Sequence, residues 1–185
     1  LVSFAKLYSE GLPMPKSYFT SGELSENLYK KLSLKLGSPF VAKDLIKQRG
    51  LGVFLIDSKE TFLKLKGKFI FQTMLEKKHE YRVLILGGRV GVFEEKISGS
   101  TGEFRNNVAL GAKEIFLDKG KISKKIEDIC IKASAVLKLD IAGAEVVEDV
   151  AGKYYLLEVN RGPGLTYSEN SPEFKEIAEY LEKNA

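Results

Sequence analysis

Apolar and polar residues alternate along the chain with two different periods, which outline helices and strands in turn. Leucines spaced by four between Leu24 and Leu36 predict a helix that Ser21 or Ser25 caps and that Gly37 ends. The same helical period predicts further helices at 1–10, 59–65, 123–137 and from 172 onward. Shorter apolar stretches bounded by turn residues predict strands at 16–19, 40–44, 52–56, 68–75, 81–86, 89–93, 141–148 and 154–160.

This mixture of elements predicts an α+β fold made of two lobes. We expect a smaller lobe at 1–75 and a larger lobe at 76–185, joined at 73–80. The dipeptide Gly87-Gly88 predicts a hairpin turn in the larger lobe. Residues 98–112 are rich in glycine and asparagine and poor in aliphatic residues, so we expect a long loop there. Loops of that length in compact domains are usually functional or disordered.

The amino-acid composition excludes several kinds of active site but says little about the fold. The 185 residues are 44% hydrophobic and 29% charged, with a net charge of +4, as expected of a packed domain. A single cysteine, Cys130, excludes an intramolecular disulfide and a multi-cysteine zinc site, and its place on an apolar helical face predicts a buried thiol. A single histidine, His79, excludes any site that needs two. Any chemistry must therefore use carboxylates, lysines, arginines and backbone groups.

Neither a membrane nor a nucleic acid is an expected partner. The longest apolar stretches fall far below the ~20 residues that a membrane helix needs. Basic residues are scattered among acidic ones, without the basic stripe typical of a nucleic-acid-binding surface. The chain lacks an initial methionine and a recognisable leader peptide. We therefore expect a cytoplasmic protein and a segment excised from a longer chain, and we leave open whether it forms a homo-oligomer.

The most informative acidic residues lie on two adjacent predicted strands. If these strands pair about a turn at Ala151-Gly152, Glu145 directly faces Glu158, with Cβ atoms ~5 Å apart. Asn160 lies two residues beyond Glu158 and projects from the same face. The face is also expected to carry Ile141, Val147 and Leu156, so that water alone would screen the two like charges poorly.

Two carboxylates and an amide oxygen make a hard, all-oxygen ligand set, which suits Mg²⁺ or Mn²⁺ completed by water and phosphate oxygens. Two other interpretations compete with a metal site. The acids could be incidental residues on a solvent-facing hairpin, or they could act as the acid and base of a glycosidase. The apolar neighbours on the same face favour the metal site.

Weaker signals point to a nucleotide. Lys43 stands alone in an apolar strand, and the basic, glycine-containing segment that follows it (Lys47–Gly52) would let backbone N–H groups approach a phosphate. By itself this segment is explained better by an ordinary hairpin turn. Gln72–Leu75 follows a buried strand and could offer backbone groups to a purine, with Glu80 near a ribose, although a plain interlobe linker is the alternative.

Six stretches in this order resemble the ATP-grasp superfamily, and most closely its RimK-like branch of carboxylate–amine ligases. They extend over nearly the whole chain: Gly11–Lys16, Val41–Lys43 with Gly50–Val53, Glu80–Val83, Gly102–Asn107 with Gly111, Asp140–Glu145 and Glu158–Gly164. In such proteins two α+β lobes clamp ATP, so the resemblance implies the ATP-grasp fold. The chain departs from the pattern at Glu145, where these ligases more often carry aspartate, and in lacking the pre-ATP-grasp domain that precedes the matched segment.

The resemblance also implies roles for individual residues. The implied nucleotide contacts are Lys43, Gly50, Leu51 and Gly52 at the phosphates, Gln72, Thr73, Met74 and Leu75 at the adenine, and Glu80 at the ribose. The implied ligands of one or two Mg²⁺ ions are Glu145, Glu158 and Asn160. The implied catalytic residues are Arg105 facing the reacting acyl group, Asn107 near the phosphate and metal, and Lys96 as a helper.

The activity implied by the resemblance is an ATP- and Mg²⁺-dependent ligation of a carboxylate to an amine through an acyl phosphate. An amino acid such as glutamate, added to a peptide or protein, is the expected kind of substrate pair. The alternative is a nucleotide-binding module, or a truncated fragment, without catalysis of its own.

Overall fold

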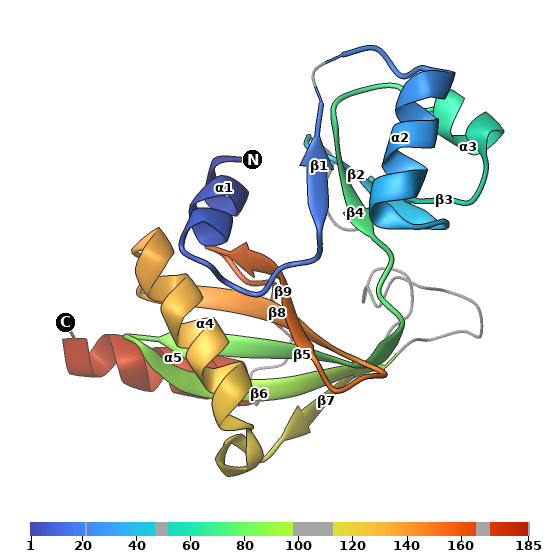
Figure 1. Cartoon of the computed structure of the whole chain (residues 1–185). Coiled ribbons are helices and arrows are strands. Elements are labelled where there is room, and N and C mark those ends of the chain that lie inside the picture. Colours follow the sequence, from blue (N-terminus) through green and yellow to red (C-terminus); the bar gives the residue numbers. More distant parts are fainter. Residues whose placement is uncertain (21, 47–51, 98–112, 166–170, 185) are drawn as a thin grey trace. The chain divides into compact units, whose positions relative to one another are not determined.

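The computed structural model of the chain (Figure 1) describes residues 1–20, 22–46, 52–97, 113–165 and 171–184. They form two compact units, one comprising Pro15–Glu76 and the other combining Leu1–Met14 with Lys77–Ala185. Residues 1–75 were expected in one lobe, but the first fourteen residues group with the larger unit, because Leu7 and Leu12 are buried in its core. None of the helices in the described ranges combines the length and the apolar composition of a membrane-spanning segment.

The unit Pro15–Glu76 is a four-stranded antiparallel sheet with two helices. Its strands are β1 (Ser17–Phe19), β2 (Phe40–Asp44), β3 (Val53–Ile56) and β4 (Phe69–Thr73), in the spatial order β1-β4-β2-β3. Its helices are α2 (Glu26–Leu36) and α3 (Lys59–Leu63). Of the two candidate caps for α2, Ser25 is the one used, since its hydroxyl accepts a hydrogen bond from the backbone N–H of Leu28.

Side chains alternate between the two faces of this sheet, as a strand period of two requires. One face packs under the helices, where a cluster of aromatic rings from both helices and strands forms the core: Tyr29, Phe40, Phe62, Phe69 and Phe71. The opposite face carries Lys43 on β2 and Gln72 on β4, which lie diagonally across the β2–β4 register. One phosphate candidate and one adenine candidate, Lys43 and Gln72, therefore share a face.

The larger unit is built on a five-stranded antiparallel sheet in the order β7-β6-β5-β8-β9. Its strands are β5 (Lys77–Leu86), β6 (Arg89–Ile97), β7 (Lys113–Leu117), β8 (Ile141–Asp149) and β9 (Tyr154–Asn160). Its helices are α1 (Val2–Ser9), α4 (Lys124–Leu137) and α5 (Pro172–Asn184), with a short 3₁₀ turn at Lys119–Lys121.

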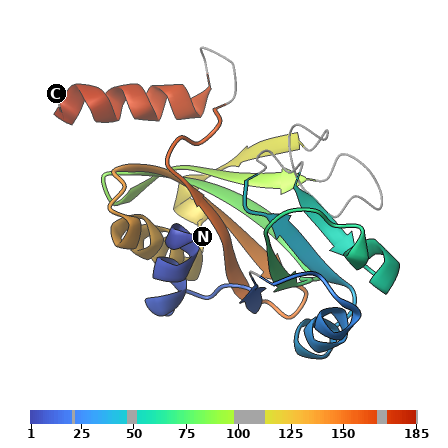
Figure 2. The same ribbon diagram turned by 90° about the horizontal axis from the view of Figure 1, so that it is seen from above.

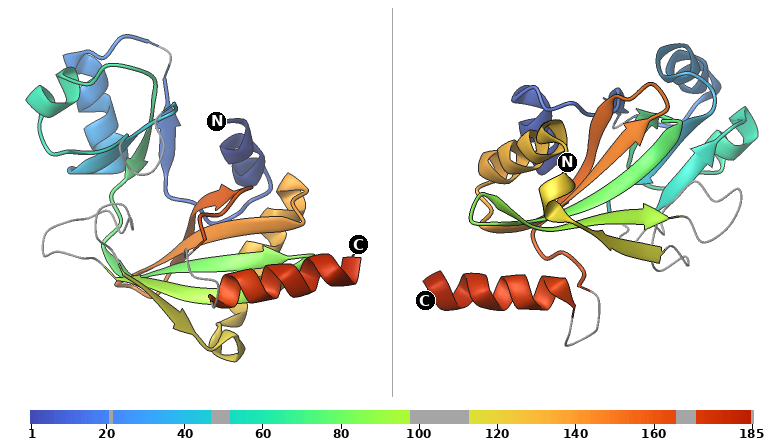
Figure 3. Two further views of the ribbon diagram at one scale, coloured as in Figure 1. Left: turned by 180° about the vertical axis from the view of Figure 1, so that it is seen from behind. Right: turned by 90° about the horizontal axis from the view of Figure 1, so that it is seen from below.

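Helices cover both faces of this sheet (Figures 2 and 3). On one face α4 and α1 bury the main core, including Val83, Ala144 and Val146. Cys130 of α4 is fully buried in that core, which confirms the expected buried thiol, and burial raises its pKa to about 12. On the other face, Ile177 and Tyr180 of α5 pack against a smaller cluster formed by Leu84, Leu86, Val92 and Ile141. We call this second face the α5 face.

Most elements expected from the sequence are confirmed, and the exceptions have local causes. The Gly87-Gly88 turn is confirmed, with both glycines at positive φ. Strand β5 begins at Lys77, earlier than the expected residue 81, because its polar first residues pair with the last residues of β8, next to the β8–β9 turn. Strand β7 was not predicted, since this short edge strand is largely exposed and shows no clean alternation. The expected loop at 98–112 lies outside the described residues.

Candidate functional site

The predicted pairing of the two glutamates is confirmed. Glu145 on β8 is the direct cross-strand partner of Glu158 on β9, and Asn160 is the partner of Gly143 two residues along. Partners in an antiparallel pair project from the same face, so the two carboxyls and the amide lie together. Glu145 also pairs with Arg82 of β5. Two residues along the same strand, and therefore on the same face, is Leu84, which belongs to the apolar cluster under α5. The two glutamates and Asn160 therefore lie on the α5 face.

A β-bulge corrects part of the reasoning behind that prediction. Nearer the turn, Val146 pairs with Leu156 and Val147 with Tyr155, so Leu157 is an extra residue in β9. The bulge moves Leu156 to the opposite face, where it is buried in the core under α4, whereas we expected it beside the glutamates. Ile141 and Val147 do lie on the α5 face, as expected.

Burial differs between the two acids. Glu145 is partly buried and Glu158 is exposed, so water screens the charge of Glu158 better than we expected. The Nζ of Lys96 on β6 donates to Oε1 of Glu145 at 2.5 Å, and the Lys96 side chain is only 6% exposed. This ammonium group sits where a positive charge is needed to offset two facing carboxylates. The sequence placed Lys96 among the catalytic helpers but did not predict this ion pair.

The donor set fits a hard divalent cation. Within the described ranges, no three acidic, histidine or cysteine side chains come together as a metal cluster. A cation here would therefore be held by two carboxylates and one amide oxygen, and water or phosphate oxygens would complete its shell. Mg²⁺ is usually bound in this way, through one or two carboxylates together with substrate phosphates.

The segment after Asn160 packs directly over β8. At Gly143, the partner of Asn160, an added Cβ would lie 2.7 Å from the Cβ of Pro163. A contact under 3.0 Å with a rigid ring atom forces the chain to shift. Gly143 therefore permits the close approach of this segment, which follows the candidate metal ligand Asn160.

We expect Gly143→Ala to lower the free energy of unfolding by about 1–3 kcal/mol, the usual cost of overpacking, as measured by denaturant titration. Gly162→Ala is the matched control, because Gly162 lies in the same segment and has open space around its Cα. The control should change stability by less than about 0.5 kcal/mol. Equal stability of the two variants would contradict the packing of Pro163 on Gly143.

Arg82 is a site residue that the sequence analysis did not assign. It lies on β5 between Glu94 of β6 and Glu145 of β8 in the sheet register. Its guanidinium donates to Oε1 of Glu114 at 2.9 Å and to the backbone carbonyl of Gly164. Arg82 thus ties the segment after Asn160 to the sheet. The sequence offered one indication of this role, because Arg82 lies two residues after Glu80 on a strand.

Glu80 is buried on the α5 face, at 4% exposure. Its carboxylate accepts a hydrogen bond from Nζ of Lys77 at 2.7 Å. Burial raises the pKa of Glu80, the charge of Glu145 adds to that effect, and Lys77 and Lys96 oppose it. The side chain expected at the ribose therefore already has an ionic partner in this structure.

The nucleotide-contact candidates of the smaller unit lie along two neighbouring antiparallel strands, with Lys43 near one end of the β2–β4 pairing and Thr73 at the other. Lys43 follows the buried apolar residues of β2. The backbone N–H of the next residue, Asp44, donates a hydrogen bond to the carbonyl of Gly52. Gln72 is buried and its amide donates to Oγ of Ser17 at 2.8 Å. Thr73 ends β4, and Met74 and Leu75 follow it without regular structure. Gly50, Leu51, Arg105 and Asn107 lie outside the described residues, so their predicted roles stay predictions.

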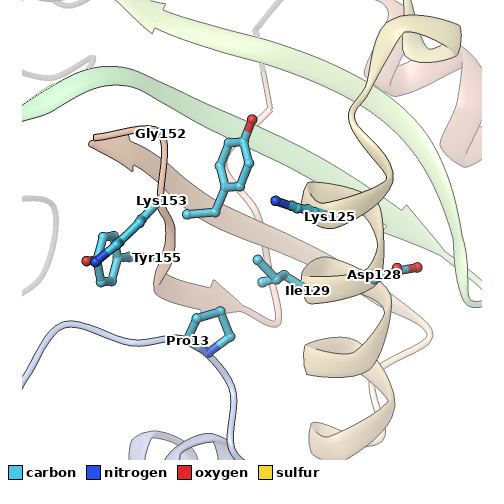
Figure 4. A pocket seen from close by; sticks show the side chains of 8 residues that line it. Pro13, Lys125, Asp128, Ile129, Gly152, Lys153 and Tyr155 are labelled. Carbon is cyan, nitrogen blue, oxygen red and sulfur yellow. The ribbon is translucent and has the colours of Figure 1, made fainter. Parts of the chain in front are cut away.

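A separate pocket lies between α4 and the β8–β9 turn of the larger unit (Figure 4). It has a volume of about 540 Å³ and is lined by Pro13, Lys125, Asp128, Ile129, Gly152, Lys153, Tyr154 and Tyr155. None of the predicted site residues lines it. In Figure 4 the Lys125 amine points into the pocket and the Asp128 carboxyl points away from it.

The arrangement of the two sheets is one that a solved structure shares. The ATP-grasp ligase PsnB, solved with a minimal precursor, Mg and ADP, has the same fold: its TM-score is 0.72 at 16% identity over 98% of this chain and 57% of that one. The ATP-grasp fold expected from the sequence is therefore confirmed.

The family follows from sequence comparison. Residues 1–181 match the model of the RimK-like ATP-grasp domain, and the chain belongs to that family. It is 28% identical over 195 residues to a probable alpha-L-glutamate ligase of Haemophilus influenzae, and 31% identical over 198 residues to one of Halorhodospira halophila. The matches span 99% and 100% of this chain, but only 62% and 63% of those relatives. The chain therefore corresponds to about three fifths of the relatives' length.

Proposed function

We propose that this chain is the nucleotide- and metal-binding part of an ATP- and Mg²⁺-dependent carboxylate–amine ligase. The observation that carries the proposal is the placement of Glu145, Glu158 and Asn160 on one face, with the Lys96 ammonium against the first of them. A purely structural hairpin has no need for two directly opposed glutamates, because like charges so placed destabilise the pair. Membership of the RimK-like family supports the same conclusion.

In this proposal, the residues of each unit contact different parts of the Mg²⁺-bound nucleotide. In the unit Pro15–Glu76, Lys43 binds the phosphates, and Gln72 with the backbone at Thr73–Leu75 binds the adenine. In the larger unit, Glu145, Glu158 and Asn160 hold Mg²⁺, which supplies charge neutralisation for the transferring phosphoryl group when bound. Glu80 binds the ribose, which requires that it exchange or share its contact with Lys77.

The proposed reaction transfers the γ-phosphoryl group of ATP to a substrate carboxylate, with ADP as the leaving group. An amine then attacks the acyl phosphate, phosphate leaves, the amine nitrogen gives up a proton, and an amide bond forms. Lys96 neutralises Glu145 before the cation binds and is then free to face the phosphoryl oxygens. Arg105 stabilises the oxyanion of the tetrahedral intermediate, and Asn107 orients the phosphate.

The relatives and structural neighbours suggest the substrate class. The relatives are named as probable alpha-L-glutamate ligases, and PsnB was also solved with a precursor peptide. We propose that L-glutamate supplies the amine and that a peptide or protein carboxyl group is the acceptor.

The proposal is tested by measuring binding and turnover separately. Calorimetry should show that ADP binds more tightly with Mg²⁺ than with a chelator, and ADP release from ATP should require both Mg²⁺ and a peptide carboxylate. No binding of the Mg²⁺–ADP complex by the folded chain would contradict the proposal. Binding with metal dependence but no turnover would instead support the alternative, a nucleotide-binding module that needs further protein for catalysis.

A further inference from the structure

A second pair of acidic residues lies on the α5 face. Glu94 of β6 is fully buried, and Glu173 in the first turn of α5 is 1% exposed. Val92 of β6 and Ile177 of α5 belong to the same apolar cluster. Glu94 follows Val92 by two residues on the same face, and Glu173 precedes Ile177 by one helical turn, so this packing brings the two acids to the same region. Neither carboxyl oxygen of Glu94 has a hydrogen-bond partner among the described residues. Two ionised carboxylates contain no hydrogen-bond donor. Two facing carboxyl groups therefore form a hydrogen bond only when one of them carries a proton.

Charges around the pair indicate which carboxyl holds the proton. Burial and then the facing charge of Glu173 raise the pKa of Glu94 to about 8; Glu114 of β7 adds to the effect and Arg82 of β5 opposes it. Glu173 lies near the amino end of a thirteen-residue helix whose backbone N–H of Phe174 is capped by Ser171. A helix amino terminus stabilises a negative charge. If the two carboxyls share one proton, Glu94 is therefore the side that holds it, and Glu173 accepts the hydrogen bond.

The same arrangement controls where Arg82 points. Arg82 is the cross-strand neighbour of Glu94, yet its guanidinium contacts Glu114 and the carbonyl of Gly164. A neutral Glu94 does not compete for that guanidinium, whereas an ionised Glu94 would attract it strongly in a buried site. Lys96, two residues along β6 on the same face, is already engaged by Glu145.

We propose that Glu94 is a positioning residue: its protonated carboxyl donates to Glu173, which docks the start of α5 on the sheet and leaves Arg82 to hold the segment that follows Asn160. Loss of the proton would place two negative charges in one buried site and draw Arg82 away from Gly164. The start of α5 would then detach, and the metal-binding end of β9 would lose its restraint. The part of this proposal that concerns the metal rests on the proposed function; the docking of α5 does not.

The sign of the pH dependence follows from proton linkage. The folded chain holds the Glu94 proton up to about pH 8, whereas an exposed Glu94 would lose it near the ordinary glutamate pKa of 4.5. Docking is therefore strongest at low pH, and local opening of α5 should increase about tenfold per pH unit until roughly pH 8, where it levels off.

The test is hydrogen exchange in α5 of the 185-residue chain, expressed as protection factors between pH 6 and pH 9. Wild-type protection in the first two turns should fall by roughly 100-fold between pH 6 and pH 8. Glu94→Gln keeps the shape, donates to Glu173 and cannot ionise, so its protection should stay level over that range. Glu176→Gln is the matched control, because Glu176 is on the same helix but pairs with Arg89 and Lys119, and it should retain the wild-type slope.

Two further measurements keep the outcome decisive. Glu173→Gln should also flatten the profile, because its amide can donate to an ionised Glu94, so the test does not depend on one variant. The affinity for Mg²⁺–ADP should fall between pH 7 and pH 9 in the wild type and less so in Glu94→Gln. The proposal would be overturned if the protection factors of both Glu94→Gln and Glu173→Gln fell with pH as steeply as those of the wild type. Absence of Mg²⁺–ADP binding in every variant, with the predicted exchange pattern intact, would overturn the proposed function and leave the docking of α5 supported.

Discussion

Replacing Glu158 with glutamine is expected to weaken the Mg²⁺-dependent binding of ADP by about 100-fold or more, since even residues that only orient a metal ligand change affinity by about 10–100-fold. Glu158 is exposed and faces Glu145, so the substitution removes one ligand charge without opening the core. Binding of ADP in the presence of a chelator should stay the same or tighten slightly, because one carboxylate near the phosphates is gone. Calorimetry with and without Mg²⁺ separates the two effects.

Glu148→Gln is the control for that experiment. Glu148 lies on the same strand as Glu145 but on the opposite face, where it pairs with Lys78. This variant should bind Mg²⁺–ADP as the wild type does. An unchanged metal dependence in Glu158→Gln would show that the facing acids are structural and would contradict the proposed metal site.

Lys43→Met should weaken ADP binding by about 10- to 100-fold, because a hydrogen bond to a charged group contributes about 1.5–3 kcal/mol. Methionine keeps much of the apolar stem that lies along β2, so the fold should be retained. Unlike the loss of Glu158, this loss should appear both with Mg²⁺ and with a chelator, since Lys43 is proposed to contact the phosphates themselves.

Lys35→Met supplies the comparison for Lys43. Lys35 is an exposed residue near the end of α2, on the helical side of the same unit. Its replacement should leave ADP affinity unchanged. If Lys43→Met and Lys35→Met bind ADP equally well, the face of the sheet that carries Lys43 and Gln72 does not bind the nucleotide.

The pairing of Glu145 with Glu158 could be predicted from the sequence because a tight turn limits the register of a hairpin to a few choices. The bulge at Leu157 could not, since one extra residue leaves the apolar and polar pattern of β9 almost unchanged. The outcome was a correct pair of acids beside an incorrect placement of Leu156. The glycine-bounded turns and the serine caps, such as Ser25 on α2, were predictable for the same local reason.

Arg82 and Glu94 show where sequence reasoning stops. Each is a charged residue in a strand that looks ordinary, and nothing nearby in the chain reveals that Glu94 is fully buried. Its burial depends on Glu173, 79 positions away, and Arg82 finds its partner Gly164 only through the order of the strands. Pairings between residues so distant in sequence are set by packing rather than by local preference.

The amino-acid sequence by itself determined the alternating α+β pattern, the hard-oxygen character of the candidate metal ligands and the resemblance to RimK-like ligases, because these depend on residue types and short spacings. Tertiary structure alone decided that Lys96 neutralises Glu145, that residues Leu1–Met14 join the larger unit, and that a second acid pair is buried under α5. The reason is physical: periodicity and turn chemistry act over a few residues, whereas the burial of a charge depends on every element that packs around it.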